Sequence, residues 1–130
     1  MLLPAQLGPA SSWSVSDFGQ KWVTTPAASG GTAKVTVATV PQDELWLLDF
    51  VRVSASPIAS TQDVRAYVCH DTEDFDVMGT ATGQYDVADQ NSPIHAPGGT
   101  EILLVWKDMP DGATGRGYVQ WTVMRTGGTY

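Results

Sequence analysis

Apolar and polar residues alternate with a period of two from Ala33 onward, which is the pattern of half-buried β-strands. The stretch KVTVATV (residues 34–40) alternates throughout. It is followed by the turn residues PQDE (residues 41–44) and then by LWLLDFVRVSA (residues 45–55). Two strands joined by a short polar turn predict a β-hairpin.

The second of these stretches is apolar on both faces over its first half. Strict alternation assigns Trp46, Leu48 and Phe50 to one face, and Leu47, Asp49, Val51 and Val53 to the other. A strand that is buried on both faces is typical of the interior of a sheet. We therefore predict that residues 45–55 form a central strand.

Further strands are predicted at residues 63–70, 84–87, 100–107 and 117–125, and the last two are rich in β-branched and aromatic residues. No apolar spacing typical of a long helix is present. Short strands separated by Gly, Pro, Asn and Asp at intervals of about 8 to 12 residues predict an all-β fold. The expected architecture is a single antiparallel β-sandwich of Greek-key or jelly-roll type.

Turn chemistry accounts for the polar residues that lead into the last two strands. Asp86, Asp89 and Asn91 are favoured turn residues, and His95 is expected to be exposed in a loop. Pro97 and Gly98 suit positions i+1 and i+2 of a type II turn. Before the last strand, Pro110, Asp111 and Gly112 suit positions i+1, i+2 and i+3 of a type I turn.

Residues 1–32 differ from the rest of the chain. They are rich in Pro, Gly, Ser and Ala and lack the periodicity of a helix or a long strand. They nevertheless contain Trp13, Phe18 and Trp22, and an aromatic side chain buries about 150–250 Å² when it docks. We therefore predict an extended N-terminal arm over residues 1–32 and a sandwich domain over residues 33–130. The arm is expected to bind this domain or a neighbouring protein through the three aromatic side chains.

The five tryptophans divide into two groups. Trp46, Trp106 and Trp121 lie inside predicted strands, where burial of each side chain contributes about 4–6 kcal/mol. Trp13 and Trp22 are candidates for contacts with a partner, because tryptophan is enriched among the residues that dominate interfaces. An exposed row of aromatic side chains would alternatively suit stacking on sugar rings.

Composition and charge narrow the function classes. With 130 residues, 42% apolar and 16% charged, the chain is expected to fold as one domain. Its net charge of −7 and isoelectric point near 4.4 argue against binding to the phosphates of nucleic acids. Seven acidic residues against one arginine between Asp63 and Asp89 give this region a net charge of −6. One strongly acidic surface region is therefore expected.

The environment of the chain is predicted from its cysteine and its apolar runs. The single cysteine, Cys69, is expected to be a buried free thiol in a protein that folds in a reducing cytosol. No apolar run is long enough for a membrane span, and MLLPAQLGPA (residues 1–10) lacks the features of a secretory signal. Neither membrane insertion nor export is expected.

A candidate calcium site lies in the loop HDTEDFDVMG (residues 70–79), where Asp71, Glu73, Asp74 and Asp76 are clustered. An EF-hand register that starts at Asp71 places Phe75 in a ligand position, so the alternative is a solvated acidic loop. His70 and His95 form no zinc motif with the single cysteine. No nucleophile motif or phosphate-binding loop is present, and no enzymatic activity is predicted. Glycoside hydrolysis by two carboxylates that come together only in the folded chain stays open as an alternative.

Three stretches of the chain share a characteristic order: PQDELWLLDFVRVS (residues 41–54), DVADQNSPIHAPGGTEILLVW (residues 86–106) and YVQWTVMR (residues 118–125). Together they resemble small all-β virion proteins of tailed bacteriophages. In that family a P-x-x-E-x-W hairpin opens the sandwich, an aDxxsPixxpgGe segment leads into a late strand ending in Trp, and a v-Q-W/Y strand closes it. The resemblance covers about residues 40–125 and implies a virion structural role in a capsid decoration protein, a head fibre or a tail component.

We therefore predict a non-enzymatic phage virion structural protein of the capsid decoration or minor capsid type, which binds the outer shell through its body and its arm. The expected partners are the major capsid protein or other virion proteins, with further copies of the chain in a homo-oligomer or symmetric array. No cofactor, nucleic acid or membrane is expected, and the location is the virion, with the host cytoplasm during assembly. The alternatives are a tail or head-fibre component and a carbohydrate-binding sandwich module assisted by calcium.

Overall fold

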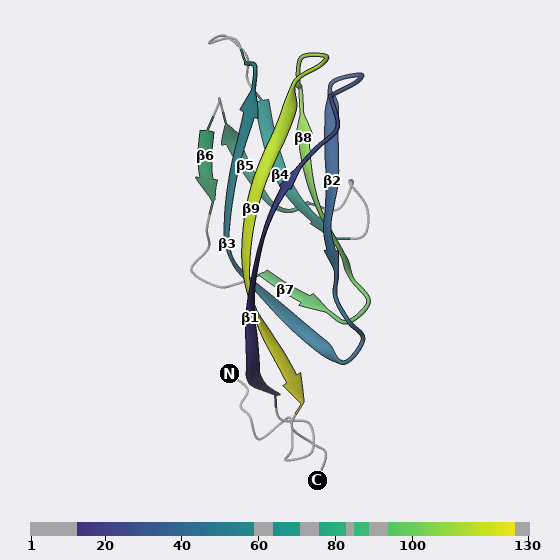
Figure 1. Ribbon diagram of the computed structural model, residues 1–130, viewed down its shortest axis with the longest axis vertical. Coiled ribbons are helices and arrows are strands. Elements are labelled where there is room, and N and C mark those ends of the chain that lie inside the picture. Colours follow the sequence, from purple (N-terminus) through teal and green to yellow (C-terminus); the bar gives the residue numbers. More distant parts are fainter. Residues whose placement is uncertain (1–12, 59–63, 71–75, 83–84, 89–93, 127–130) are drawn as a thin grey trace.

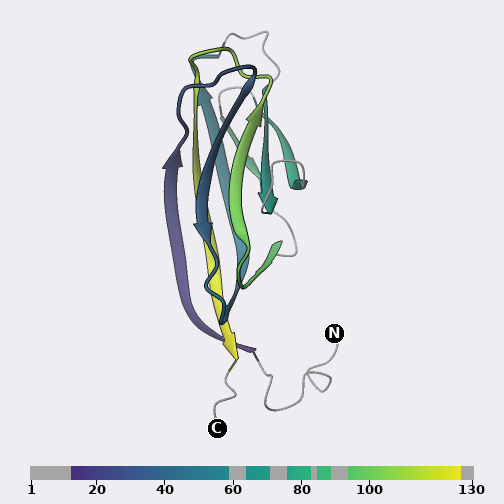
Figure 2. The ribbon, with the colours of Figure 1, turned by 90° about the vertical axis from the view of Figure 1, so that its right-hand side faces the viewer.

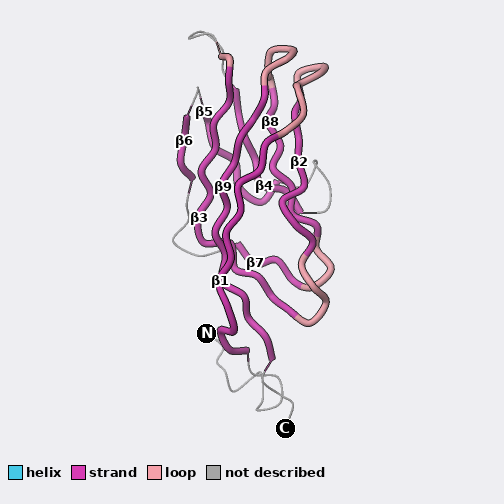
Figure 3. Tube along the Cα trace, viewed as in Figure 1, coloured by secondary structure: helices cyan, strands magenta, loops and turns pink. Residues whose placement is uncertain are grey.

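The computed structural model describes residues 13–58, 64–70, 76–82, 85–88 and 94–126 of the chain. Within these residues the secondary structure consists of strands and connecting loops (Figure 3), and no helix is long and apolar enough to cross a membrane. The strands are β1 (Trp13–Thr24), β2 (Thr32–Thr39), β3 (Glu44–Ser56), β4 (Val64–His70), β5 (Asp76–Thr82), β6 (Tyr85–Ala88), β7 (Ile94–Pro97), β8 (Glu101–Lys107) and β9 (Thr114–Thr126).

The strands form two antiparallel sheets that pack face to face (Figure 1). Sheet A has the order β1-β9-β3-β6, and β7 pairs with β3 beside β6. Sheet B has the order β2-β8-β4-β5. The predicted all-β sandwich is confirmed, and β3 lies inside sheet A as expected.

The pairings nest inside one another along the chain. β4 pairs with β5, β3 with β6 and β7, β2 with β8, and β1 with β9. This is the pattern of one long hairpin whose two arms are rolled up into two sheets, which is the jelly-roll arrangement. Each arm changes sheets at most of its turns, so strands that follow one another in sequence often do not pair.

The predicted hairpin of residues 34–40 and 45–55 is therefore wrong in its pairing, although both strands exist. β2 belongs to sheet B and β3 to sheet A. The turn between them is closed by a hydrogen bond from the Glu44 amide to the Pro41 carbonyl, 3.0 Å. This turn carries the chain across the sandwich and does not reverse it within one sheet. The connection from β8 to β9 crosses in the same way.

Two predicted turns are displaced by one residue. The amide of Thr100 donates to the carbonyl of Pro97, so the residue at i+2 is Gly99, with φ of 88°. The amide of Ala113 donates to the carbonyl of Pro110, so Gly112, with φ of 86°, also occupies i+2. Glycine adopts positive φ without the steric cost that a Cβ would bring. The glycine that follows each proline by two residues therefore sets the register of the turn.

The face assignment in β3 changes at a β-bulge between Leu48 and Phe50. Because Asp49 is an extra residue, Val51 returns to the core face beside Leu48, and Phe50 turns outward. The predicted grouping of Phe50 with Trp46 and Leu48 is therefore wrong. The three strand tryptophans are in the core as predicted: Trp46, Trp106 and Trp121 are 8%, 0% and 9% exposed.

Residues 13–24 of the predicted arm form β1, a strand of 12 residues that pairs with β9 along its whole length. The expectation that this segment lacks a long strand is therefore wrong. β1 is an edge strand of sheet A and runs along one side of the molecule (Figure 2). Residues 1–12 lie outside the described residues, and the division of the chain at residue 32 stays a prediction.

Candidate partner-binding surface on sheet A

A β-bulge brings the three aromatic residues of β1 to one face of sheet A. Trp13 and Val15 lie opposite Thr126 and Met124 on β9, and the register then shifts between Val15 and Asp17. Beyond the shift, Phe18 and Trp22 lie opposite Thr122 and Tyr118. Opposed residues of an antiparallel pair share a face. The extra residue therefore places Trp13, Phe18 and Trp22 on the same outward face, although their odd and even numbers would separate them on a regular strand.

Within residues 13–58, 64–69 and 94–126, whose side-chain burial is described, all exposed large hydrophobic side chains lie on this face of β1. They are Trp13, Val15, Phe18 and Trp22, with exposed fractions of 37%, 55%, 71% and 49%. The core beneath is closed by other residues, so these side chains are not needed to complete it. Several exposed apolar side chains gathered on one face are typical of an interaction surface.

The outward face continues from β1 across β9 to β3 in rows of opposed residues. One row consists of Trp22, Tyr118 and Arg52, the next of Gln20, Gln120 and Phe50, and the third of Phe18, Thr122 and Leu47. We call this set, together with Trp13, Asp49 and Arg116, the sheet A surface. It combines aromatic, amide and charged side chains.

Ring contacts fix the aromatic part of the sheet A surface. The centroids of Trp22 and Tyr118 are 4.7 Å apart, and those of Phe50 and Tyr118 are 6.3 Å apart with an edge-on geometry. The guanidinium carbon of Arg116 lies 4.4 Å from the ring centroid of Trp22, a cation–π contact. Tyr118 thus holds two neighbouring aromatic side chains in place.

Hydrogen bonds fix the amide part. The Tyr118 hydroxyl donates to Gln20 Oε1 at 2.6 Å and accepts from Gln120 Nε2 at 2.6 Å. Among the described residues, Gln20 Nε2 and Gln120 Oε1 have no hydrogen-bond partner. These two groups are therefore oriented and still able to bond to a ligand.

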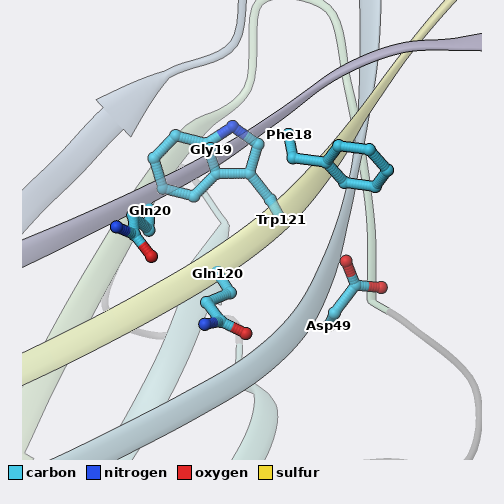
Figure 4. A pocket seen from close by; sticks show the side chains of 6 residues that line it. All are labelled: Phe18, Gly19, Gln20, Asp49, Gln120 and Trp121. Atoms are coloured by element: carbon cyan, nitrogen blue, oxygen red, sulfur yellow. The ribbon is translucent and has the colours of Figure 1, made fainter.

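Two shallow depressions lie side by side on the sheet A surface. The first, of about 360 Å³, is lined by Phe18, Gly19, Gln20, Asp49, Gln120 and Trp121, which come from three adjacent strands (Figure 4). The second, of about 490 Å³, is lined by Gln20, Trp22, Phe50, Arg52, Tyr118 and Gln120. Because both share Gln20 and Gln120, the two depressions adjoin, and together we call them the trough.

Asp49 reaches the trough because it is the extra residue of the bulge in β3. Its Oδ2 atom accepts a hydrogen bond of 2.7 Å from the Thr122 hydroxyl. The bulges in β1 and β3 thus flank β9 from both sides and turn Phe18 and Asp49 to the same depression (Figure 4). β-Bulges commonly redirect a side chain in this way beside functional sites.

The trough rests on a stacked pair of buried indoles. Trp46 and Trp121 lie with ring centroids 4.4 Å apart and planes within 7°. The indole of Trp121 also lies against Gly19 of β1, where an added Cβ would come within 2.2 Å of the ring. Glycine at this position lets β1 approach Trp121 closely, so the core ring positions the strand that carries the exposed aromatics.

A buried carboxylate orients the stacked pair. Glu44 is 8% exposed. It accepts a hydrogen bond of 2.7 Å from Trp46 Nε1 and forms an ion pair with Arg125. The Trp46 indole N–H and then the Arg125 guanidinium lower the pKa of Glu44 below its ordinary value of 4.5. Glu44 and Trp46 are the E and W of the P-x-x-E-x-W pattern, so its role here is structural.

The free edge of β1 has features that oppose pairing with another strand. Lys21 Nζ donates 2.8 Å to the carbonyl of Val37, the bulged residue of β2 at the edge of sheet B. A lysine and a bulge on an edge strand both oppose pairing with another strand. The outward face of β1 is therefore better suited to binding than its edge.

Most of the candidate calcium ligands fall outside the residues that the structure describes. Asp71, Glu73 and Asp74 are outside the described residues, and Asp76 begins β5. Among the residues that are described, no three His, Cys, Asp or Glu side chains group as a metal site. Cys69 is fully buried as predicted, in a small cluster with Leu103 and Val105. His95 is exposed, but it lies in β7 and not in a loop.

Sequence reasoning identified Trp13, Phe18 and Trp22 but missed the residues that surround them. Asp49, Tyr118 and Gln120 lie in strands that were predicted, but no role was assigned to their polar side chains. Arg116 directly precedes the predicted strand 117–125, and Gln20 lies in the segment for which no strand was predicted. The outward face of the last strand could have been recognised from the residues between its apolar positions. Residues 116, 118, 120 and 122 are all polar or amphipathic. That pattern marks an outward face, but it does not say which strand lies beside it.

No protein-family model matches the chain, and no curated protein matches it in sequence. Solved structures of similar fold include a chain from the acid-stable capsid of Helicobacter pylori bacteriophage KHP30, with a TM-score of 0.60 and 10% identity over 85% of this chain and 91% of that one. A chain from the virus-like particle of the extra small virus of the prawn Macrobrachium rosenbergii gives a TM-score of 0.39 and 12% identity over 88% and 85%. Bacillus endospore appendages give 0.29 and 16% over 84% and 88%. At this identity, the likeness to the KHP30 chain shows a shared β-sandwich fold.

Proposed function

We propose that the chain is a non-enzymatic structural protein of a phage virion, of the capsid decoration or minor capsid type. In this proposal the sheet A surface docks on a neighbouring virion protein, and Trp13, Phe18 and Trp22 are its main contacts. The observation that carries the proposal is the gathering of four exposed large hydrophobic side chains, Trp13, Val15, Phe18 and Trp22, on one face of β1. Such side chains are costly to leave in water and are enriched where proteins bind one another.

The fold and the chemistry of the trough support this role. The chain shares its fold with a chain of the KHP30 capsid structure, and its sequence resembles virion proteins of tailed phages. The two depressions together contain one carboxylate, Asp49. Glycoside hydrolysis commonly requires two, and the open trough is better suited to contact than to the exclusion of water.

The docking proposal is tested by co-sedimentation of the protein with capsids that lack it. Because residues 13–24 pair with β9, deletion of the whole segment would remove a strand, so point substitutions are the cleaner experiment. Trp13→Ala, Phe18→Ala and Trp22→Ala combined are expected to weaken capsid binding at least about tenfold, since aromatic anchors dominate interface energies. Deletion of residues 1–12 tests the remainder of the predicted arm separately.

Thr39→Ala, an exposed position on β2 in sheet B, is the matched control and should bind as the wild type does. Equal urea midpoints for all variants would show that binding, and not folding, was changed. Undiminished capsid binding by the triple variant would exclude the sheet A surface as the docking site.

A carbohydrate-binding function is the second candidate, because Trp13 and Trp22 are both exposed on the same face of one strand. If it holds, glycans should quench tryptophan fluorescence in the wild type, and Trp22→Ala should reduce the quenching. The titration is run with calcium and with a chelator, since calcium assistance was part of the prediction. An array of glycans without a hit in either condition would count against this candidate.

A further inference from the structure

The trough on the sheet A surface has opposite charges at its two ends. The depression beside Phe18 contains Asp49 as its charged side chain. The adjoining depression contains Arg52, and Arg116 lies over Trp22 at its border. Asp49 and Arg52 are three residues apart on β3, which corresponds to about 10 Å along a strand. The trough therefore has a polarity along its length.

The negative end is suited to a basic side chain. Asp49 Oδ2 already accepts from Thr122, which orients the carboxylate, and Oδ1 has no hydrogen-bond partner among the described residues. Gln120 Oε1 is a second acceptor at the same depression. The ring of Phe18, 71% exposed, adds an aromatic face. A carboxylate, an amide oxygen and an aromatic ring together bind ammonium or guanidinium groups.

The positive end is suited to a carboxylate. The contact with the Trp22 ring orders the Arg116 guanidinium, and within the described part of the chain Arg116 makes no ion pair. Arg52 lies 5.8 Å from the ring centroid of Phe50 and adds a second positive charge. Guanidinium groups held in place in this way recognise carboxylates through paired hydrogen bonds.

We propose that the occupant of the trough is an extended segment of the neighbouring virion protein that carries a basic and an acidic side chain about 10 Å apart. The basic side chain enters the depression between Phe18 and Asp49, and the acidic one faces Arg52 and Arg116. Reversal of the segment would bring like charges together, so the two ends fix its direction. This inference rests on the proposed function and adds the chemistry of the partner to it.

The experiment measures capsid binding of Asp49→Lys and Arg116→Glu at low and high salt. Each reversal should weaken binding about tenfold at low salt, and Asp49→Asn and Arg116→Gln about threefold. High salt should weaken the wild type more than it weakens the two neutral variants, because screening removes only the charge that remains. Asp49→Asn keeps an acceptor for the Thr122 hydroxyl, so its capsid binding still tests the role of the charge if Asp49→Lys does not fold.

Asp111→Lys is the matched control, because it makes the same change of charge at an exposed turn residue before β9. It should bind as the wild type does. If the aromatic variants lose binding while the charge variants and the salt response match the wild type, this inference falls and the proposed function stands. If the aromatic variants also bind normally, both fall.

Discussion

Replacement of Trp121 by alanine lowers the free energy of unfolding by about 3–5 kcal/mol, and it loosens the strand that carries the exposed aromatics. Trp121 is 9% exposed and stacks on Trp46, with 4.4 Å between ring centroids. Its indole also fills the space beneath Gly19. Removal of the ring therefore leaves a cavity between β1, β3 and β9, and the atoms that lined it lose their contacts. Urea unfolding at pH 7 measures the loss through the shift of the midpoint.

Trp22→Ala is the matched control for this prediction, because it deletes the same side chain from the same sheet on the outward face. Trp22 is 49% exposed and contacts Tyr118, so its loss should lower the free energy of unfolding by only about 1 kcal/mol. Equal effects of the two substitutions would contradict the assignment of Trp121 to the support of the trough. A large effect of Trp121→Ala on capsid binding at temperatures where the variant is folded would add that β1 must be held rigidly.

Many of the strands could be predicted from the sequence because apolar and polar residues alternate along a strand that is buried on one face. Six of the nine strands lie within or close to segments that were expected from this alternation, among them β3 and β9. The pairings could not be predicted, since a turn such as residues 41–44 has the same composition whether it joins neighbours in one sheet or crosses a sandwich. Pairing is decided by the rolled-up topology, to which residues far apart in sequence contribute.

The bulges explain why the site was seen only in part. A single extra residue reverses the alternation beyond it, so β1 shows no continuous period of two. In β3, strict alternation assigned Asp49 and Phe50 to opposite faces of the strand, although both line the trough. A bulge can be recognised in hindsight as two alternating stretches offset by one residue, as at residues 13–15 and 18–24. From one sequence, that offset looks like the absence of a strand.

The pattern P-x-x-E-x-W, which suggested a virion protein, has a physical explanation in the core. Glu44 closes the turn that starts at Pro41 and accepts the buried indole N–H of Trp46. Trp46 in turn stacks on Trp121 of the closing strand. Glu44, Trp46 and Trp121 of the matched stretches therefore build this end of the sandwich. Other residues of the same stretches, among them Asp49, Tyr118 and Gln120, line the trough on the outward face.

Replacement of Glu44 by alanine should lower the free energy of unfolding by about 2–3 kcal/mol at pH 7, because Trp46 Nε1 would stay buried without an acceptor. Glu44→Gln keeps a side-chain oxygen for this N–H and removes only the charge, so its loss should be smaller. Urea unfolding of the two variants beside the wild type separates the hydrogen bond from the ion pair with Arg125.

Comparison of the wild type with Glu44→Gln also shows how the contribution of the Glu44 charge to the free energy of unfolding depends on pH. The Trp46 N–H and the Arg125 guanidinium lower the pKa of Glu44 in the folded state below 4.5. A lowered folded pKa contributes stability that is complete above the unfolded pKa and is lost as the pH falls through the folded pKa. The stability difference between the wild type and Glu44→Gln should therefore be constant from about pH 7 to about pH 5.5 and shrink below about pH 4.5. A difference that keeps its full size down to about pH 2 would show that the charge of Glu44 contributes nothing, and that its oxygen alone holds the indole.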